Sequence, residues 1–118
     1  MPTQRFEVAV AAGGTVLNLV AGTKFEFLPV DASIMIYAVQ DGGLVPAGGV
    51  TMDVSYGNVI DADAVSIPSF TAGQGPNRLD HQVSAGVARA GDRLQVKIHN
   101  GTATTSNVRT LVEYRPIV

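Results

Sequence analysis

Cysteine and tryptophan are both missing from this chain of 118 residues, and charged side chains are few. Without cysteine there can be no disulfide framework, no thiolate nucleophile and no cysteine metal site. Without tryptophan, a sugar-binding surface would lack the largest aromatic side chain for stacking. These absences exclude several common kinds of site before any motif is considered.

Charged residues make up only 15% of the sequence, against about 25% in an average soluble domain. Hydrophobic residues reach 46%, and the formal net charge is -2. A surface with so little charge indicates that part of it is buried against another subunit or another protein. The alternative is that serine, threonine, asparagine and glutamine supply the missing polarity.

Clusters of basic residues and long apolar runs are also missing. The eight lysines and arginines are scattered between Arg5 and Arg115, which argues against a partner bound through nucleic-acid phosphates. No apolar run approaches the roughly 20 residues of a membrane-spanning helix, and the residues from Met1 to Phe6 do not resemble a signal peptide. We expect a soluble chain with neither nucleic acid nor membrane as partner.

Helical spacing is rare, whereas apolar and polar residues alternate along much of the chain. Leu94, Val96 and Ile98 alternate with polar residues. Val108 and Val112 share a second apolar face, opposite Arg109, Glu113 and Arg115, which should face water. Strand candidates, of which 59–60 and 64–67 are the shortest, lie at residues 4–11, 15–20, 24–30, 33–40, 50–56, 59–60, 64–67, 82–88, 94–99 and 108–115.

The order of these segments predicts an all-β fold with eight or nine short strands. Glycine-containing turns separate the strands, and residues 69–80 form the longest expected loop. We expect a single domain of residues 1–118, an antiparallel two-sheet sandwich of jelly-roll type, with a barrel as the alternative. Residues 33–40 are apolar on both faces and should form a central strand, and the last two segments should pair as a C-terminal hairpin.

Candidate chemical residues do not assemble into a complete site. His81 and His99 are the only histidines, and Asp80 could be a third ligand only if all three converged. Asp61 and Asp63 resemble half of a calcium loop, but they lack the further acids and the placed glycine, so they are expected at a turn or a strand end. No Gly-x-Ser-x-Gly elbow or phosphate-binding glycine motif is present. We therefore predict no catalytic, cofactor or metal residues, and no enzyme activity.

Residues 90–101, Ala-Gly-Asp-Arg-Leu-Gln-Val-Lys-Ile-His-Asn-Gly, are followed by a threonine-rich tip and by Leu-Val-Glu-Tyr at 111–114. This arrangement resembles the closing strands of small jelly-roll capsid decoration (cement) proteins of tailed bacteriophages. It covers about a quarter of the chain, and similar hairpins occur in other trimeric jelly rolls and in sugar-binding modules. The resemblance implies a virion protein, made in the host cytoplasm, that binds the capsid exterior and bridges neighbouring subunits of the major capsid protein.

A protein of this kind would associate with itself, as a dimer or trimer, and with the shell. The segment from residue 2 to 5 is expected to be free to pair with a neighbouring sheet edge, and the loop from 71 to 80 is expected to dock. The predicted partner-binding residues are Pro2, Thr3, Gln4, Arg5, Gln74, Asn77, Arg78 and Asp80.

Two other classes of function stay open at this point. One is a carbohydrate- or receptor-binding module of a fibre or tail protein, which exposed Tyr37 or Tyr56 beside Asp61 and Asp63 would favour. The other is a small hydrolase or isomerase, for which two histidines are too few.

Overall fold

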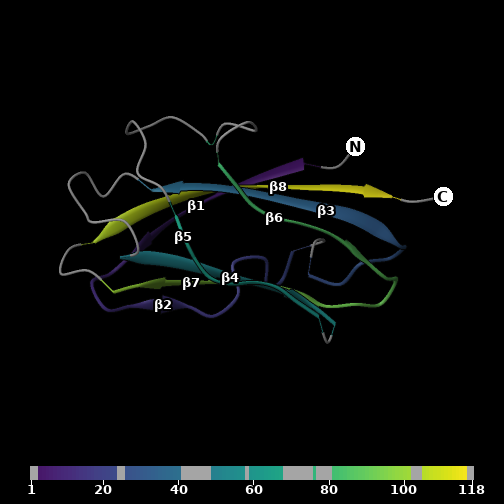
Figure 1. Cartoon of the computed structure of the whole chain (residues 1–118), viewed down its shortest axis with the longest axis horizontal. Coiled ribbons are helices and arrows are strands. Elements are labelled where there is room, and N and C mark those ends of the chain that lie inside the picture. The colour runs from purple at the N-terminus through teal and green to yellow at the C-terminus, as the bar shows by residue number, and fades with distance from the viewer. Residues whose placement is uncertain are drawn as a thin grey trace.

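The computed structural model describes residues 3–23, 26–40, 49–57, 59–67, 76, 81–101 and 105–116. They form two antiparallel sheets packed face to face (Figure 1). Sheet A contains, in spatial order, β1 (Thr3–Val10), β8 (Ser106–Pro116), β3 (Ala32–Gln40) and β6 (Gln82–Ala88). Sheet B contains β2 (Thr15–Val16), β7 (Leu94–Asn100), β4 (Val50–Tyr56) and β5 (Val59–Ser66). The expected all-β, two-sheet sandwich is confirmed.

The strand order is that of a jelly roll. The first strand pairs with the last, the second with the seventh, the third with the sixth and the fourth with the fifth. The β3–β8 and β4–β7 pairings then join these pairs into two four-stranded sheets. Eight strands wound in this way make two Greek keys, the architecture expected from the sequence. In the part of the chain that the structure describes, no helix has the length and apolar character to cross a bilayer.

The core lies between the two sheets. β3 contributes Ile34 and Ile36, and β7 contributes Val96 and Ile98, all fully buried. These side chains alternate with outward-facing ones along each strand, so the period-two pattern of the sequence directly specifies the buried face. The prediction that residues 33–40 form a central strand is confirmed, because β3 has a paired strand on each side.

The predicted C-terminal hairpin was wrong. β7 belongs to sheet B and β8 to sheet A, so the chain crosses from one sheet to the other between them. Only β4 and β5 are consecutive strands of the same sheet. Alternation identifies the face that each strand buries, but two strands facing each other across a core show the same pattern as two strands paired in a hairpin.

Two other predicted strands are shorter than expected or missing. The strand expected at 15–20 ends at Val16, because the Asn18 side chain takes over the contact with β7. Its Oδ1 accepts a hydrogen bond from the Val96 amide at 3.0 Å, and its Nδ2 donates to the Leu94 carbonyl at 3.2 Å. Of the strand expected at 24–30, residues 24 and 25 lie outside the described residues, and the rest contains only an isolated bridge between Phe27 and Arg93.

Charged residues on the outer face of sheet A are more deeply buried than the sequence indicated. Arg109 and Glu113 were expected to face water, but they are only 7% and 9% exposed. Arg109 lies directly opposite Glu7 of β1, an opposite-charge pair across neighbouring strands. Leu111, between them on β8, and Tyr37 and Val39, opposite on β3, are also buried, so this part of the outer face of sheet A is covered rather than exposed to water.

One end of the sandwich, called the turn end below, carries the Gly57 turn between β4 and β5 and the Gly91 turn between β6 and β7. It is the right-hand end in Figure 1. Gly57 has a φ of 58°, a left-handed conformation that favours glycine, and a Cβ atom there would also displace the Asp92 carboxylate, whose Oδ1 would lie 2.8 Å away. Glu26 fastens the adjoining segment through an ion pair with Arg93 at 2.9 Å. The Gly22 amide and Arg93 both lower the pKa of Glu26.

Buried polar side chains fix the opposite end. Asn100, at the end of β7, is fully buried, and its Nδ2 donates to the Val10 carbonyl of β1 at 2.9 Å. Gln40 of β3 donates to the Ile67 carbonyl at 3.3 Å and accepts from the Ser106 hydroxyl at 2.7 Å. The bonds to Val10 and Ile67 join one sheet to the other or to the segment that leaves it, whereas the bond from Ser106 joins β8 to β3 within sheet A.

We predict that Asn100→Ala lowers the free energy of unfolding by about 1–3 kcal/mol, because the buried Val10 carbonyl loses its donor. Urea denaturation followed by circular dichroism would measure the change. His99→Ala, next along the strand but exposed, should cost less than Asn100→Ala. Equal costs for the two variants would contradict this role of Asn100.

Candidate functional site

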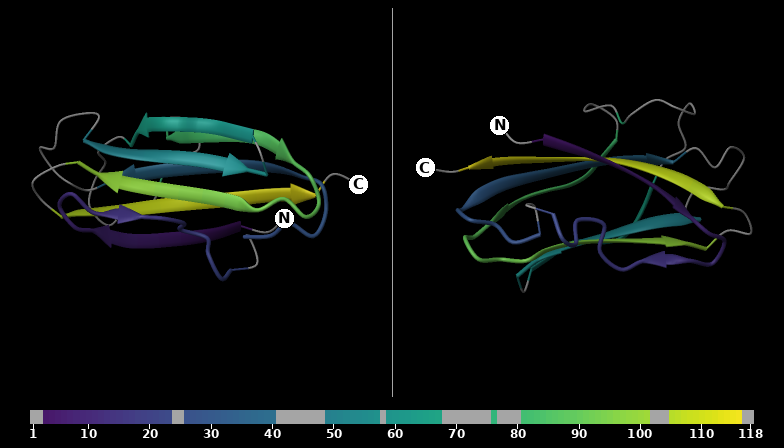
Figure 2. Two further views of the ribbon diagram at one scale, coloured as in Figure 1. Left: turned by 90° about the horizontal axis from the view of Figure 1, so that it is seen from below. Right: turned by 180° about the vertical axis from the view of Figure 1, so that it is seen from behind.

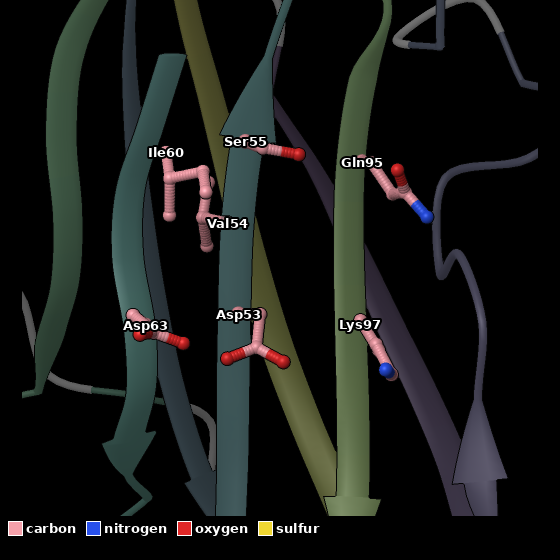
Figure 3. Close-up of a pocket in the computed structure, with 7 residues that line it drawn as sticks. All are labelled: Asp53, Val54, Ser55, Ile60, Asp63, Gln95 and Lys97. Atoms are coloured by element: carbon pink, nitrogen blue, oxygen red, sulfur yellow. The ribbon is translucent and has the colours of Figure 1, made fainter. Parts of the chain in front are cut away.

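A shallow hollow of about 220 Å³ lies on the outer face of sheet B. Two rows of side chains from β5, β4 and β7 line it (Figure 3). One row contains Ile60, Ser55 and Gln95, and the other contains Asp63, Asp53 and Lys97. Ser55 pairs in register with both Ile60 and Gln95, and Asp53 pairs with Lys97, so the ladder itself sets the spacing of these groups.

The charged row of this hollow places two carboxylates side by side. Asp53 lies between Asp63 and Lys97, so one lysine partly compensates two negative charges (Figure 3). Carboxylates accept hydrogen bonds, whereas the Lys97 ammonium and the Gln95 amide donate them. The arrangement can therefore bind a polar group with several hydroxyls or a basic side chain.

Asp61 belongs to a different cluster, at the seam between the two sheets. Its Oδ2 accepts a hydrogen bond from Ser84 of β6, and its carboxylate is also hydrogen-bonded to the Tyr56 hydroxyl. Gly86 of β6 lies against the same hydroxyl, and a Cβ atom there would overlap it. Asp61 thus ties the β5 edge of sheet B to the β6 edge of sheet A, a structural role.

The expectation that Asp61 and Asp63 occupy a turn or a strand end was wrong, because both lie within β5. Alternation alone would place them on one face, but the β4–β5 register shifts between Met52 and Ser55. As a result, Asp61 contacts β6 while Asp63 lines the outer hollow. In the described part of the chain, no three His, Cys, Asp or Glu side chains are grouped as metal ligands would be.

The two histidines take part in separate contacts. His99 is exposed on the outer face of sheet B, where its Nδ1 lies 2.9 Å from the Thr15 hydroxyl. His81 is buried at the start of β6, and its carbonyl accepts a hydrogen bond from the Ala38 amide at 3.0 Å. Asp80, the third ligand considered for a metal, lies outside the described residues.

Only part of the predicted partner-binding set can be located. Pro2, Gln74, Asn77, Arg78 and Asp80 lie outside the described residues. Thr3, Gln4 and Arg5 lie in β1, an edge strand that pairs with β8 on one side, and the pairing of this segment with a neighbouring sheet edge stays a prediction. Arg5 is exposed and Gln4 is half-buried, and their role in binding a partner stays a prediction.

Sequence reasoning did not single out Asp53, Lys97 or Ile60. The alternation of residues 50–56 placed Asp53 on the polar face of a strand, and that of residues 94–99 did the same for Lys97. Their convergence depends on β4 and β7 being neighbours in register, which the pattern of one strand cannot show.

With this geometry established, comparison with known proteins adds no relative, because no family model and no curated protein matches the chain. The fold and its surfaces are therefore the basis for inferring the function.

We predict that the free energy of unfolding falls above about pH 10. Burial raises the pKa of Tyr56, and the charge of Asp61 and its hydrogen bond add to this effect. The folded protein holds the Tyr56 proton more tightly than the unfolded chain does. This stabilisation is fully present below the pKa of Tyr56 in the unfolded chain, and it is lost as the pH rises through the higher pKa of Tyr56 in the folded protein. Urea denaturation at a series of alkaline pH values should show a shallower decline for Tyr56→Phe than for wild type; identical declines would refute the assignment.

We also predict that a chelator leaves the melting temperature unchanged. Asp61 is hydrogen-bonded to Ser84 and Tyr56, and the remaining pair, Asp53 and Asp63, lies beside Lys97, whose charge opposes a bound cation. Thermal unfolding followed with and without EDTA provides the test. A large chelator-dependent drop that disappears in Asp63→Asn would instead place a calcium ion in the hollow.

Proposed function

We propose that this chain is a non-enzymatic structural protein of a virion, which binds the outer surface of a capsid and bridges neighbouring shell subunits. The observation that carries the proposal is a set of exposed apolar side chains at the turn end of a jelly roll. Of the six large apolar residues exposed in the described part of the chain, five lie toward this end: Phe27, Val30, Val59, Ile60 and Val87.

Exposed apolar side chains gathered at one end are typical of a surface that binds another protein. This end also carries charged side chains, but Glu26 pairs with Arg93, and the Asp31 and Asp92 carboxylates accept hydrogen bonds from the Ala90 and Arg89 amides, so these groups already have partners within the protein. Two rigid sheets can transmit load between subunits of a shell without a change of conformation. The jelly roll itself occurs in viral capsid proteins and also in lectins and enzymes, so the fold alone does not decide between these functions.

The competing ligand-binding function has weaker support. Exposure of Tyr37 or Tyr56 was the feature that would favour it, and each is only 4% exposed. The Tyr37 hydroxyl donates to Met35 Sδ at 3.3 Å, and Tyr56 belongs to the seam with Asp61. Neither ring is available to stack on a sugar. The hollow at Asp53 and Asp63 is the remaining feature that favours a hydroxyl-rich ligand.

We predict that Ile60→Ser weakens binding to particles by about tenfold, the effect of about 1.4 kcal/mol. Ile60 is 72% exposed at the turn end, so the change should leave the fold intact and remove apolar area from the interface. Co-sedimentation of the purified protein with virus particles from the source of this chain would measure binding.

Leu17→Ser is the matched control for that experiment. Leu17 is 71% exposed, nearly the same as Ile60, but it follows β2 at the opposite edge of sheet B. Its replacement should leave particle binding unchanged. Equal losses for the two variants would contradict a docking surface at the turn end, and no association of the wild-type protein with particles would refute the capsid role.

A further inference from the structure

The four edge strands of the sandwich differ in how well they are protected against pairing with another chain. An exposed edge has unpaired backbone donors and acceptors, and proteins usually protect such edges with short strands, bulges or proline. β2 is only two residues long. The β5 and β6 ladders are irregular, and the contact between Asp61 and Ser84 joins these two edges to each other.

β1 has none of these protections. It runs for eight residues, pairs with β8 without a register shift, and contains no proline or lysine. Among the described strands it has a hydrogen-bonded neighbour, β8, on one side only, and it forms one margin of sheet A, as the left view of Figure 2 shows. Gln4, Phe6 and Val8 lie on the core side and are half-buried, and Phe6 and Val8 pack against the core.

β1 carries two exposed side chains of opposite charge. Arg5 and Glu7 are exposed on the outer face of sheet A, two positions apart. Within its own sheet Glu7 lies opposite Arg109 and accepts a hydrogen bond from Asn107 at 2.7 Å, whereas Arg5 lies opposite Leu111. Arg5 thus has no acidic residue directly opposite it in β8. A strand added on the other side of β1 could place one there.

We propose that β1 pairs antiparallel with β1 of a second copy, about a two-fold axis at Phe6. In this register Arg5 of each copy lies opposite Glu7 of the other, and the two Phe6 rings meet on the core side. A shift of two residues either way would place Arg5 opposite Arg5 or Glu7 opposite Glu7. A shift of one residue would exchange the faces of the sheet. The result is a symmetric dimer with one continuous eight-stranded sheet.

Charge reversal tests this register. Arg5→Glu creates two repulsive pairs in a dimer of the variant, and so does Glu7→Arg. Each should weaken dimerisation by about tenfold or more. An equimolar mixture of the two variants should dimerise again, because the two acidic side chains of one variant then face the two basic side chains of the other. Sedimentation velocity over a range of concentrations would measure the equilibrium, with wild type reaching twice the monomer mass of 12.3 kDa.

Arg89→Glu is the control, since it makes the same change of charge on an exposed residue in the turn between β6 and β7 and should leave dimerisation unchanged. Glu7 also faces Arg109 in its own sheet, so thermal unfolding would be used to check that each variant folds. If a charge-reversal variant does not fold, Arg5→Gln or Glu7→Gln, which removes the charge without reversing it, takes its place. Loss in the single variants and recovery in the mixture would establish the pairing. A monomeric wild type, undiminished association of the single variants, or a mixture that does not recover would overturn it.

This inference rests on the self-association included in the proposed function, but it is measured without particles. A charge-dependent dimer that never binds particles would refute the capsid role and leave the β1 pairing established. A strictly monomeric protein that binds particles would support the capsid role and refute the β1 pairing.

Discussion

The central position of β8 is the constraint on which the rest of the structure depends. This strand, close to the end of the chain, lies between β1 and β3 and pairs with both along most of its length. The hydrogen bond from Asn107 to Glu7 joins residues 100 positions apart. Sheet A therefore cannot form until almost the whole chain is present, and long-range pairing of this kind makes folding slow. It also leaves β1, the first strand, at the margin of sheet A, where no other described strand pairs with its outer side.

The residues that sequence reasoning located best are those whose environment depends on their own strand. Alternation identified β4 and β7, which bury every second residue in the core, and apolar residues on both faces identified β3, whatever strand lies beside each of them. It could not identify neighbours: β7 and β8 share a pattern, yet they belong to different sheets. The hollow at Asp53, Asp63 and Lys97 was beyond prediction for the same reason, since three strands and one irregular register create it.

Polar side chains explain several features that hydrophobic patterning left open. Asn18 ends β2 because its amide pairs with the backbone of β7. Asn100 and Gln40 make comparable bonds inside the sandwich, at the end opposite the turn end. A buried amide without a partner costs free energy, so these residues favour one arrangement of the crossing segments over others with the same apolar burial. An amide in a mostly apolar run is therefore an informative signal for the order of strands.

The fold places many of the few charged residues of the sequence on the outer faces of its two sheets. Arg5, Glu7, Arg109 and Glu113 lie together on the outer face of sheet A, and Asp53, Asp63 and Lys97 on that of sheet B. Charge on both outer faces keeps the sheets from stacking through their faces, whereas five of the exposed large apolar side chains lie toward the turn end. The proposed contacts with a shell and with a second copy would use this end and the edge of β1. Because these two surfaces are separate, one molecule could bind a shell through its end and a second copy through its edge, the geometry required for a protein that bridges subunits.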